Sequence, residues 1–301
     1  MTTRRAHAHE GEQAVRQRVG AVRRPPVFGP ELNQGFADFI RAQRMLVIGA
    51  ADDDGHLWAT AVTGPAGFAD PVDETTVVLS GEPAAGDPLR GAFAVERDCG
   101  TLALDPVTGR RVRANGTLRD HGGRLVLRTE QVLRNCTKYI QKREPVGDAD
   151  PAEPVATTGD ALSARQQDWI AGADTFFIAS RSPAHGADVS HRGGRPGFVA
   201  VSGSRRLSWP DYRGNSFFMT LGNLELDPAC GLLFLDWQRG RTLHLTGRAL
   251  VDWEDASAPG AERTIHFDVT RVVEIGGATA LRWKFVEHSP FNPDQDKDGT
   301  P

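Results

Sequence analysis

Two short segments in the second half of the chain gather the residue types that bind a phosphorylated small molecule. Their candidate residues are Ser190, His191, Arg192, Gly193, Arg213, Gly214, Asn215, Ser216 and Asn223. Arginine presents a planar fork of donors that suits phosphate oxygens, and serine and asparagine add neutral donors. Glycine lets a backbone approach a ligand closely. A helix is expected over 215–226, and its first amides would favour an anion.

An internal duplication organises the chain. The segment 99–109 matches the segment 230–240 at a constant offset (230 − 99 = 131). A second block, 39–68, matches 169–198 without gaps at almost the same offset (169 − 39 = 130). Chance could produce one such block, but hardly two with offsets so similar. We therefore expect two copies of one fold.

Both matched blocks have β character. Short apolar runs at 45–50 and 176–180 each precede a polar turn that contains glycine. In the other block, a hairpin turn is expected at Thr108-Gly109 and again at Arg239-Gly240. The sequence therefore predicts a mainly β protein with flanking helices, built as two tandem small barrels.

Five parts follow from this pattern and from local composition. They are an N-terminal helical extension (1–30), a first barrel (31–143), a linker rich in Pro, Asp and Gly (144–160), a second barrel (161–291) and a flexible tail (292–301).

The polar chemistry is confined to the second copy. The residues that align with Ser190, His191 and Arg192 are Thr60, Ala61 and Val62. Taken singly, each polar segment has an ordinary interpretation, as a capped turn or as a solvated loop. Their joint presence in one copy favours a ligand site there. The first copy, whose site is degenerate, is then a scaffold that forms at most one wall of the pocket.

Bulk composition excludes several classes of function. The chain has 35 Lys and Arg against 39 Asp and Glu, a net charge of −4, so we expect no nucleic-acid partner. No apolar run is long enough to cross a membrane, and the N-terminus lacks an apolar signal core, so we expect a cytoplasmic location. The three cysteines and nine histidines show no metal-ligand spacing, so no metal site is predicted and the thiols are expected to be reduced.

Several stretches resemble a known family. ADVSHRGGRPGFV (187–199) and LSWPDYRGNSFFMTLGNLELDPACGLLFL (207–235) are similar to flavin-nucleotide-binding proteins of the pyridoxamine 5′-phosphate oxidase superfamily. Members often read Asp-x-Ser-Pro-Arg-Gly and then Pro-Asp-x-x-Gly-Asn. HEGEQAVRQRVG (9–20), NCTKYIQKR (135–143) and HSPFNP (288–293) resemble the same group. One departure is His191, where the group commonly has Pro, and another is Ser216-Phe217, where basic or polar residues are frequent.

The resemblance implies two tandem split β-barrels with FMN bound at an interface between barrels. Ser190, His191 and Arg192 would then lie beside the flavin. The residues that would hold its phosphate or ribityl chain are Arg213, Asn215, Ser216 and Asn223. The implied activity is an FMN-dependent oxidoreductase acting on a small molecule. Arg192 would stabilise the reduced anionic flavin, and His191 would be the acid–base group or a passive contact.

Two other functions stay open. The chain could be a flavin, deazaflavin or haem binding protein without turnover, or the flavin subunit of a redox complex. No nicotinamide-binding glycine motif follows a strand, so a nicotinamide donor would bind transiently, or electrons would come from a partner reductase. Family members usually dimerise. We expect a homodimer, because an N-terminal helix at 9–23 has no evident place within a closed pair of barrels.

Overall fold

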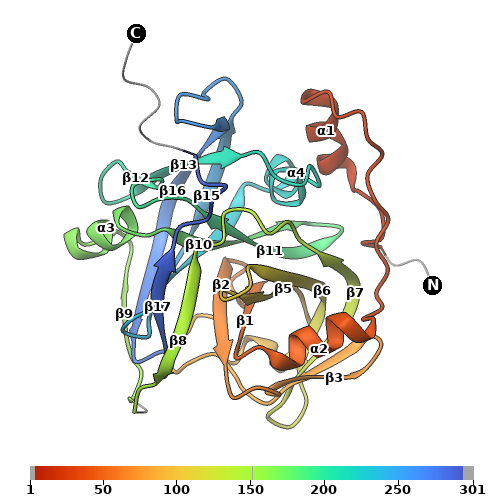
Figure 1. The fold of residues 1–301 in the computed structure, drawn as a ribbon, viewed down its shortest axis with the longest axis vertical. Coiled ribbons are helices and arrows are strands. Elements are labelled where there is room, and N and C mark those ends of the chain that lie inside the picture. Colours follow the sequence, from red (N-terminus) through yellow and green to blue (C-terminus); the bar gives the residue numbers. More distant parts are fainter. Residues whose placement is uncertain (1–3, 151, 294–301) are drawn as a thin grey trace.

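The computed structural model of the protein describes residues 4–150 and 152–293 (Figure 1). Strands of the first half are β1 (Met45–Ala51), β2 (Leu57–Thr63), β3 (Ala69–Asp73), β4 (Thr76–Leu79), β5 (Arg97–Asp105), β6 (Arg110–Asp120) and β7 (Leu125–Arg134). Those of the second half are β10 (Thr175–Ser182), β11 (Gly186–Gly193), β12 (Ala200–Val201), β13 (Arg206–Tyr212), β14 (Ala229–Asp236), β15 (Arg241–Asp252) and β16 (Ala261–Gly276). Between and after these lie β8 (Lys142–Asp148), β9 (Val155–Gly159) and β17 (Leu281–Glu287). The helices are α1 (Glu10–Arg18), α2 (Gln34–Ala42), α3 (Ala164–Ala171), α4 (Met219–Leu226) and a short 3-10 helix (Ala92–Ala94).

Each half of the chain forms one antiparallel sheet, and the two sheets have the same strand order. The first runs β2-β1-β5-β6-β7-β4-β3 and the second runs β11-β10-β14-β15-β16-β13-β12. Strands β10 to β16 of the second sheet correspond in order to strands β1 to β7 of the first. Even a local irregularity recurs, because β6 has a bulge at Gly116 and β15 has one at its sequence counterpart, Gly247. Duplication is therefore visible in the topology as well as in the sequence.

Helices α2 and α3 are also counterparts, and each begins at a side-chain cap. Asn33 accepts a hydrogen bond from the Phe36 amide at 2.9 Å, and Ser163 caps α3 in a reciprocal capping box with Gln166. Such caps satisfy amides that have no partner within the helix. Each helix leads into the first strand of its sheet, β1 or β10. The mainly β class with flanking helices, in two tandem barrel-like units, is confirmed.

Alternation along the central strands produces three apolar cores. In β1, Leu46 and Ile48 pack into the core of the first half, whereas Met45 and Val47 face the second half. Strand β10 does the same with its own alternate residues, and Phe177 lies in the shared core. Successive strand side chains point to opposite faces, so a strand that is apolar at every position is buried on both. The two halves are consequently joined by a continuous apolar layer.

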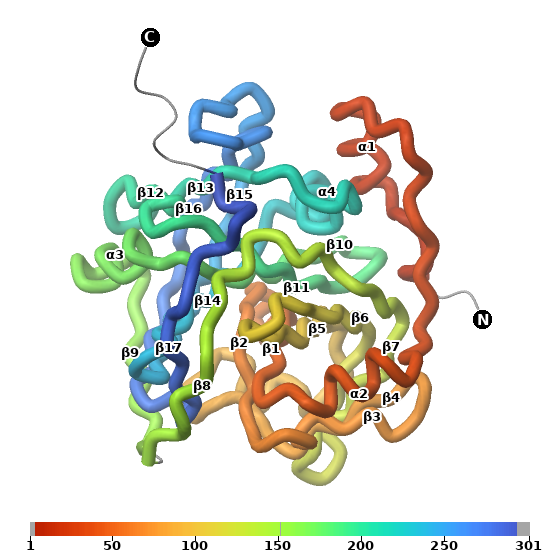
Figure 2. Tube along the Cα trace, viewed as in Figure 1, coloured from red at the N-terminus to blue at the C-terminus, as the bar shows by residue number. Residues whose placement is uncertain are grey.

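The segment expected as a linker, 144–160, contains the end of β8 and all of β9. Strand β8 pairs with β17 from the other end of the chain, and β9 joins the second sheet beside β16 (Figure 2). Its Pro- and Gly-rich composition therefore conceals two strands that tie the halves together. The boundaries of the five expected parts stay predictions.

The N-terminal segment runs along one side of the molecule (Figure 1). Helix α1 packs against α4 of the second half, and the chain then returns along the first sheet to α2. The helix thus has a place within a single chain. This removes the reason for expecting a homodimer, which stays a prediction.

One expected helix begins later than predicted. The prediction placed its start at Asn215, but α4 starts at Met219. Ser216 and Phe218 both adopt left-handed backbone angles, with φ of 60° and 61°, and such angles interrupt a helix. The apolar spacing that suggested the longer helix does not report these angles.

Two further expectations concern cysteines and membranes. All three cysteines, Cys99, Cys136 and Cys230, are free thiols. Over residues 4–150 and 152–293, no helix combines the length and the apolar character needed to cross a bilayer. Of the expected tail, only Asn292 and Pro293 belong to the described residues.

Candidate functional site

A cleft lies where the two halves of the chain meet. Its empty volume is about 940 Å³, including space open to solvent. The first half contributes β6 and the segment 135–139 that follows β7. The second half contributes β11, the end of β13, the loop 214–218 and the first turn of α4. Ligand pockets of this size commonly hold a cofactor or a drug-sized molecule.

Two arginines of β6 supply positive charge from the first half. Arg111 and Arg113 alternate along the strand, so both point to the same face, toward the cleft. Arg113 is buried and forms an ion pair with Asp188 of β11, with 2.9 Å between Nη1 and Oδ1. Burial lowers the pKa of Arg111 to about 9, and the neighbouring Arg113 acts in the same direction. Binding an anion would relieve this electrostatic stress.

Further charges line the cleft. Lys138 and Arg192 add two cations, and Asp211 and Glu262 add two acids. Among the described residues, Arg111, Lys138 and Arg192 form no ion pair, whereas Asp211 lies 3.7 Å from Arg263. Burial raises the pKa of Asp211 against the opposing effect of Arg192 and Arg263. The cleft therefore has an excess of unpaired positive charge.

His191 is a buried polar side chain without a hydrogen bond. Its exposure is 4%, and neither ring nitrogen has a partner among the described residues. Phe177 contacts the ring edge-on, with centroids 5.7 Å apart. Burial lowers the pKa of His191 well below its ordinary value, and Arg111 and Arg192 act in the same direction. The imidazole is consequently neutral, with one donor and one acceptor unused at the cleft wall.

Ser190 is already occupied within the protein. Its hydroxyl oxygen accepts from Arg113 at 2.7 Å and from Thr220 at 2.9 Å. It therefore positions the arginine and the first turn of α4, although it lines the cleft. Within the described part of the chain no side chain caps α4, so the amides of its first turn remain available on the cleft wall.

Glycine at 193 has a different role from the one expected. A Cβ atom there would collide with the Tyr139 carbonyl oxygen. The close approach is made by the chain itself, because the 135–139 segment crosses β11 at this point. Tyr139 then donates a hydrogen bond from its hydroxyl to the Arg213 carbonyl at 2.9 Å, and its ring lies 5.3 Å from that of Tyr212. These contacts shape one rim of the cleft.

The structure brings most, but not all, of the predicted residues together. Those that line the cleft are Ser190, His191, Arg192, Gly193, Gly214, Asn215 and Ser216. Arg213 and Asn223 do not. Asn223 is buried beside a smaller cavity, where it donates to Ser180 at 3.0 Å. One turn of helix separates it from the cleft-facing start of α4.

The equivalent position in the other half is filled by protein. There, Thr60 stands for Ser190 and His244 stands for Arg113. Thr60 donates a hydrogen bond to Asp87, whose carboxylate lies 3.6 Å from the His244 ring, and all three side chains are buried. The His244 ring also bonds to the Ala59 carbonyl at 2.9 Å. These groups satisfy one another, whereas Arg111 and Arg192 of the cleft form no ion pair among the described residues.

Sequence reasoning missed the contribution of the first half. Arg111, Arg113, Lys138 and Tyr139 all line the cleft. A signal was present, because Arg111 and Arg113 alternate along an expected strand, and the second copy has Thr242 and His244 in place of these arginines. Comparing the copies in both directions would have revealed it.

Comparisons with known proteins give weak similarities only. No protein-family model matches the chain, and no curated protein matches it. Among solved structures, HupZ of Group A Streptococcus is 11% identical, with a TM-score of 0.32 over 38% of this chain and 98% of that one. A putative pyridoxamine 5′-phosphate oxidase of Lactobacillus delbrueckii is 15% identical, with a TM-score of 0.30 over 37% and 93%. An FAD binding protein of Mycobacterium smegmatis is 11% identical, with a TM-score of 0.27 over 40% and 98%. At such low TM-scores we base nothing on these similarities.

Proposed function

We propose that the cleft binds FMN and that the protein is an FMN-dependent oxidoreductase acting on a small molecule. The observation that carries this proposal is the set of unpaired cations, Arg111, Lys138 and Arg192, around the buried and unpartnered His191, all within the described residues. The three cations are half-buried and His191 is buried. Charges removed from water without an ion-pair partner and unsatisfied buried polar atoms are costly, and both concentrate at functional sites.

A phosphorylated ligand fits this donor set. Arginine binds phosphate through paired N–H groups, and the uncapped first turn of α4 adds backbone amides. Arg111 and Lys138 come from the first half, and Arg192 comes from the second, so a bound ligand would contact both halves of one chain. The resemblance of 187–199 and 207–235 to flavin-nucleotide-binding proteins selects FMN among phosphorylated ligands.

Protein groups near the flavin would tune it. Bound FMN supplies the transfer of electrons. Arg192 would favour negative charge on a bound flavin, because its guanidinium group is a cation with several N–H donors. His191 would donate or accept one hydrogen bond in its neutral form, since burial and the surrounding arginines disfavour its protonation.

Titration of the purified full-length chain with FMN tests the proposal. We expect saturable quenching of flavin fluorescence at one FMN per chain and release of the flavin on denaturation. Unchanged FMN fluorescence, with no flavin bound to the isolated protein, would refute the assignment. A Soret absorption band would instead indicate that the bound cofactor is haem. Oxidation of NADH or NADPH by the FMN-loaded protein would then support an enzyme, and its absence with every added donor would leave a binding protein.

A further inference from the structure

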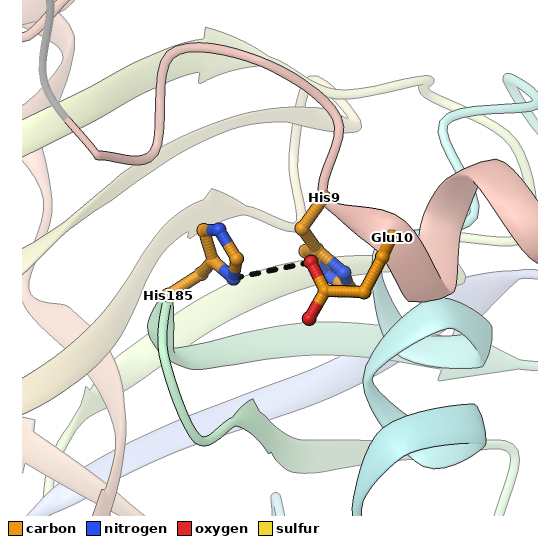
Figure 3. A group of neighbouring side chains, drawn as sticks. All are labelled: His9, Glu10 and His185. Carbon is orange, nitrogen blue, oxygen red and sulfur yellow. Dashed lines mark ion pairs between the residues drawn. The ribbon is translucent and has the colours of Figure 1, made fainter.

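We propose a second ligand site, for a divalent transition-metal ion of the zinc type, at His9, Glu10 and His185. Figure 3 shows the three side chains converging from two distant parts of the chain. His9 is the N-cap of α1, Glu10 is its first residue, and His185 lies in the turn between β10 and β11. One ligand atom from each residue lies within 4.8 Å of the other two. This cluster lies apart from the flavin cleft and does not depend on the proposed function.

The donor atoms suit such an ion. Two imidazole nitrogens and one carboxylate oxygen are a common set for zinc, with the fourth position left to water. The Nδ1 atom of His185 lies 3.9 Å from the Glu10 carboxylate, and the two imidazole rings are stacked with centroids 5.2 Å apart. Zinc holds its ligands at about 2.0–2.2 Å, so the donors must close in slightly. Glu10 can do so, because its side chain is 64% exposed.

A hydrogen-bond chain behind His9 prepares it as a ligand. Asn223 donates to Ser180 at 3.0 Å, which turns its Oδ1 atom toward His9 Nε2, also at 3.0 Å. His9 therefore carries its proton on Nε2 and its lone pair on Nδ1. Metal-bound histidines typically have such an acceptor on the other nitrogen. Within the described residues, Nδ1 accepts the capping hydrogen bond of α1 from the Glu12 amide at 3.4 Å, a long and therefore weak contact that a bound metal would replace.

A small cavity lies beside the cluster, and both histidines, His9 and His185, line it. Such space next to the donor atoms is what an ion and a water ligand at its fourth position need.

A bound metal would fasten the N-terminal helix to the second sheet. Sequence spacing could not indicate this site, because His9 precedes the first copy of the repeat and His185 lies within the second. The simpler alternative is an ion pair between Glu10 and a protonated His185, and metal titration distinguishes the two.

The test uses the full-length chain, stripped with a chelator, and Zn²⁺ alone as the probe. Competition with a chromogenic chelator should give one Zn²⁺ per chain, and Zn²⁺ should raise the melting temperature. His185→Ala and Glu10→Gln should each weaken binding roughly tenfold or more, since even outer-shell changes cost that much. His9 caps a helix, so its replacement risks unfolding and is not the chosen variant.

His121→Ala is the matched control, because His121 is an exposed turn histidine far in sequence from the cluster. It should bind Zn²⁺ as the unaltered chain does. Co²⁺ should give the visible absorption of a four-coordinate site, and this absorption should vanish in His185→Ala. Absence of saturable binding, or equal affinity with and without His185, would overturn the proposal and leave the ion pair.

Discussion

Arg113 and Asp188 form a buried ion pair that joins the two halves of the chain. The side chains are 5% and 6% exposed, and Asn115 donates a further hydrogen bond to Asp188 at 3.1 Å. The pair connects β6 of the first sheet to β11 of the second, directly beneath the cleft. The same ion pair therefore holds the two halves together and fixes the position of Arg113 at the cleft.

Asp188→Ala should destabilise the protein strongly, because it leaves Arg113 buried without its counter-charge. Removing one partner of a buried pair costs about 3–5 kcal/mol. Urea denaturation measures the free energy of unfolding. Arg206→Ala, which breaks the exposed pair between Arg206 and Asp268, is the control and should change it little. Equal changes in the free energy of unfolding would mean that the buried pair stabilises the protein no more than the exposed pair does.

Arg111→Gln and Arg192→Gln should each weaken FMN binding roughly 10- to 100-fold. This range corresponds to the loss of one charge-assisted hydrogen bond, about 1.5–3 kcal/mol. Fluorescence titration gives the dissociation constants. Arg90→Gln, which removes an exposed arginine paired with Glu82 in the first half, is the control and should bind FMN normally.

Arg213→Ala separates the structure from the sequence-based prediction. The resemblance places this residue at the phosphate, whereas the structure leaves its side chain outside the cleft. We expect near-normal FMN affinity for this variant. A loss as large as that of Arg192→Gln would show that the loop 214–218 rearranges when the ligand binds.

Glu12→Gln should stabilise the protein increasingly as the pH rises from 5 to 8. Burial raises the pKa of Glu12 from 4.5 to about 8. The folded state therefore keeps a proton that the unfolded chain has lost. Stability from this group is complete below pH 4.5 and falls as the pH approaches 8, by at most about 1.4 kcal/mol per pH unit.

Glutamine can still accept the hydrogen bond from the His9 amide, so the substitution removes the titration and keeps the helix cap. Urea denaturation at several pH values, in the presence of a chelator, measures the difference from the unaltered chain. Glu10→Gln, in the same helical turn and exposed, should show no such trend. A parallel pH dependence in Glu12→Gln and the unaltered chain would contradict the raised pKa.

Gly100→Ala and Gly231→Ala should destabilise the protein to a similar extent. The two glycines are counterparts in the matched blocks and occupy equivalent places where strands of opposite halves cross. A Cβ atom at Gly100 would lie closer than 3.0 Å to the backbone of Asp188 and Val189, and one at Gly231 would meet Leu57 and Trp58 in the same way.

Such overpacking costs about 1–3 kcal/mol, and more where the backbone cannot move. Gly35→Ala in α2 is the control, since the atom nearest to an added Cβ there, Asn33 Oδ1, lies at an ordinary contact distance of 3.4 Å, and alanine favours the helix by about 0.5–1 kcal/mol. Thermal unfolding measures all three variants. A harmless alanine at either crossing would argue that the halves pack less closely than described.

How much the sequence predicted depends on whether a feature is local or formed between distant segments. The matched blocks predicted the duplicated β fold, and the turns at Gly109 and Gly240 were expected because glycine suits their positive φ. The predicted start of this helix at Asn215 was wrong, because apolar spacing does not report the backbone angles of Ser216 and Phe218. The contribution of Arg111 was missed because the crossing of β6 and β11 depends on packing between the halves.

The filled counterpart of the cleft has a consequence for how such a protein can evolve. In a pair of identical subunits, any substitution alters both sites at once. Here Thr60, Asp87 and His244 close one site without affecting Ser190, His191 or Arg113 at the other. Because both repeats belong to one chain, each can differ from the other: the first places Arg111 and Arg113 at the cleft, and the second places strand β11 there.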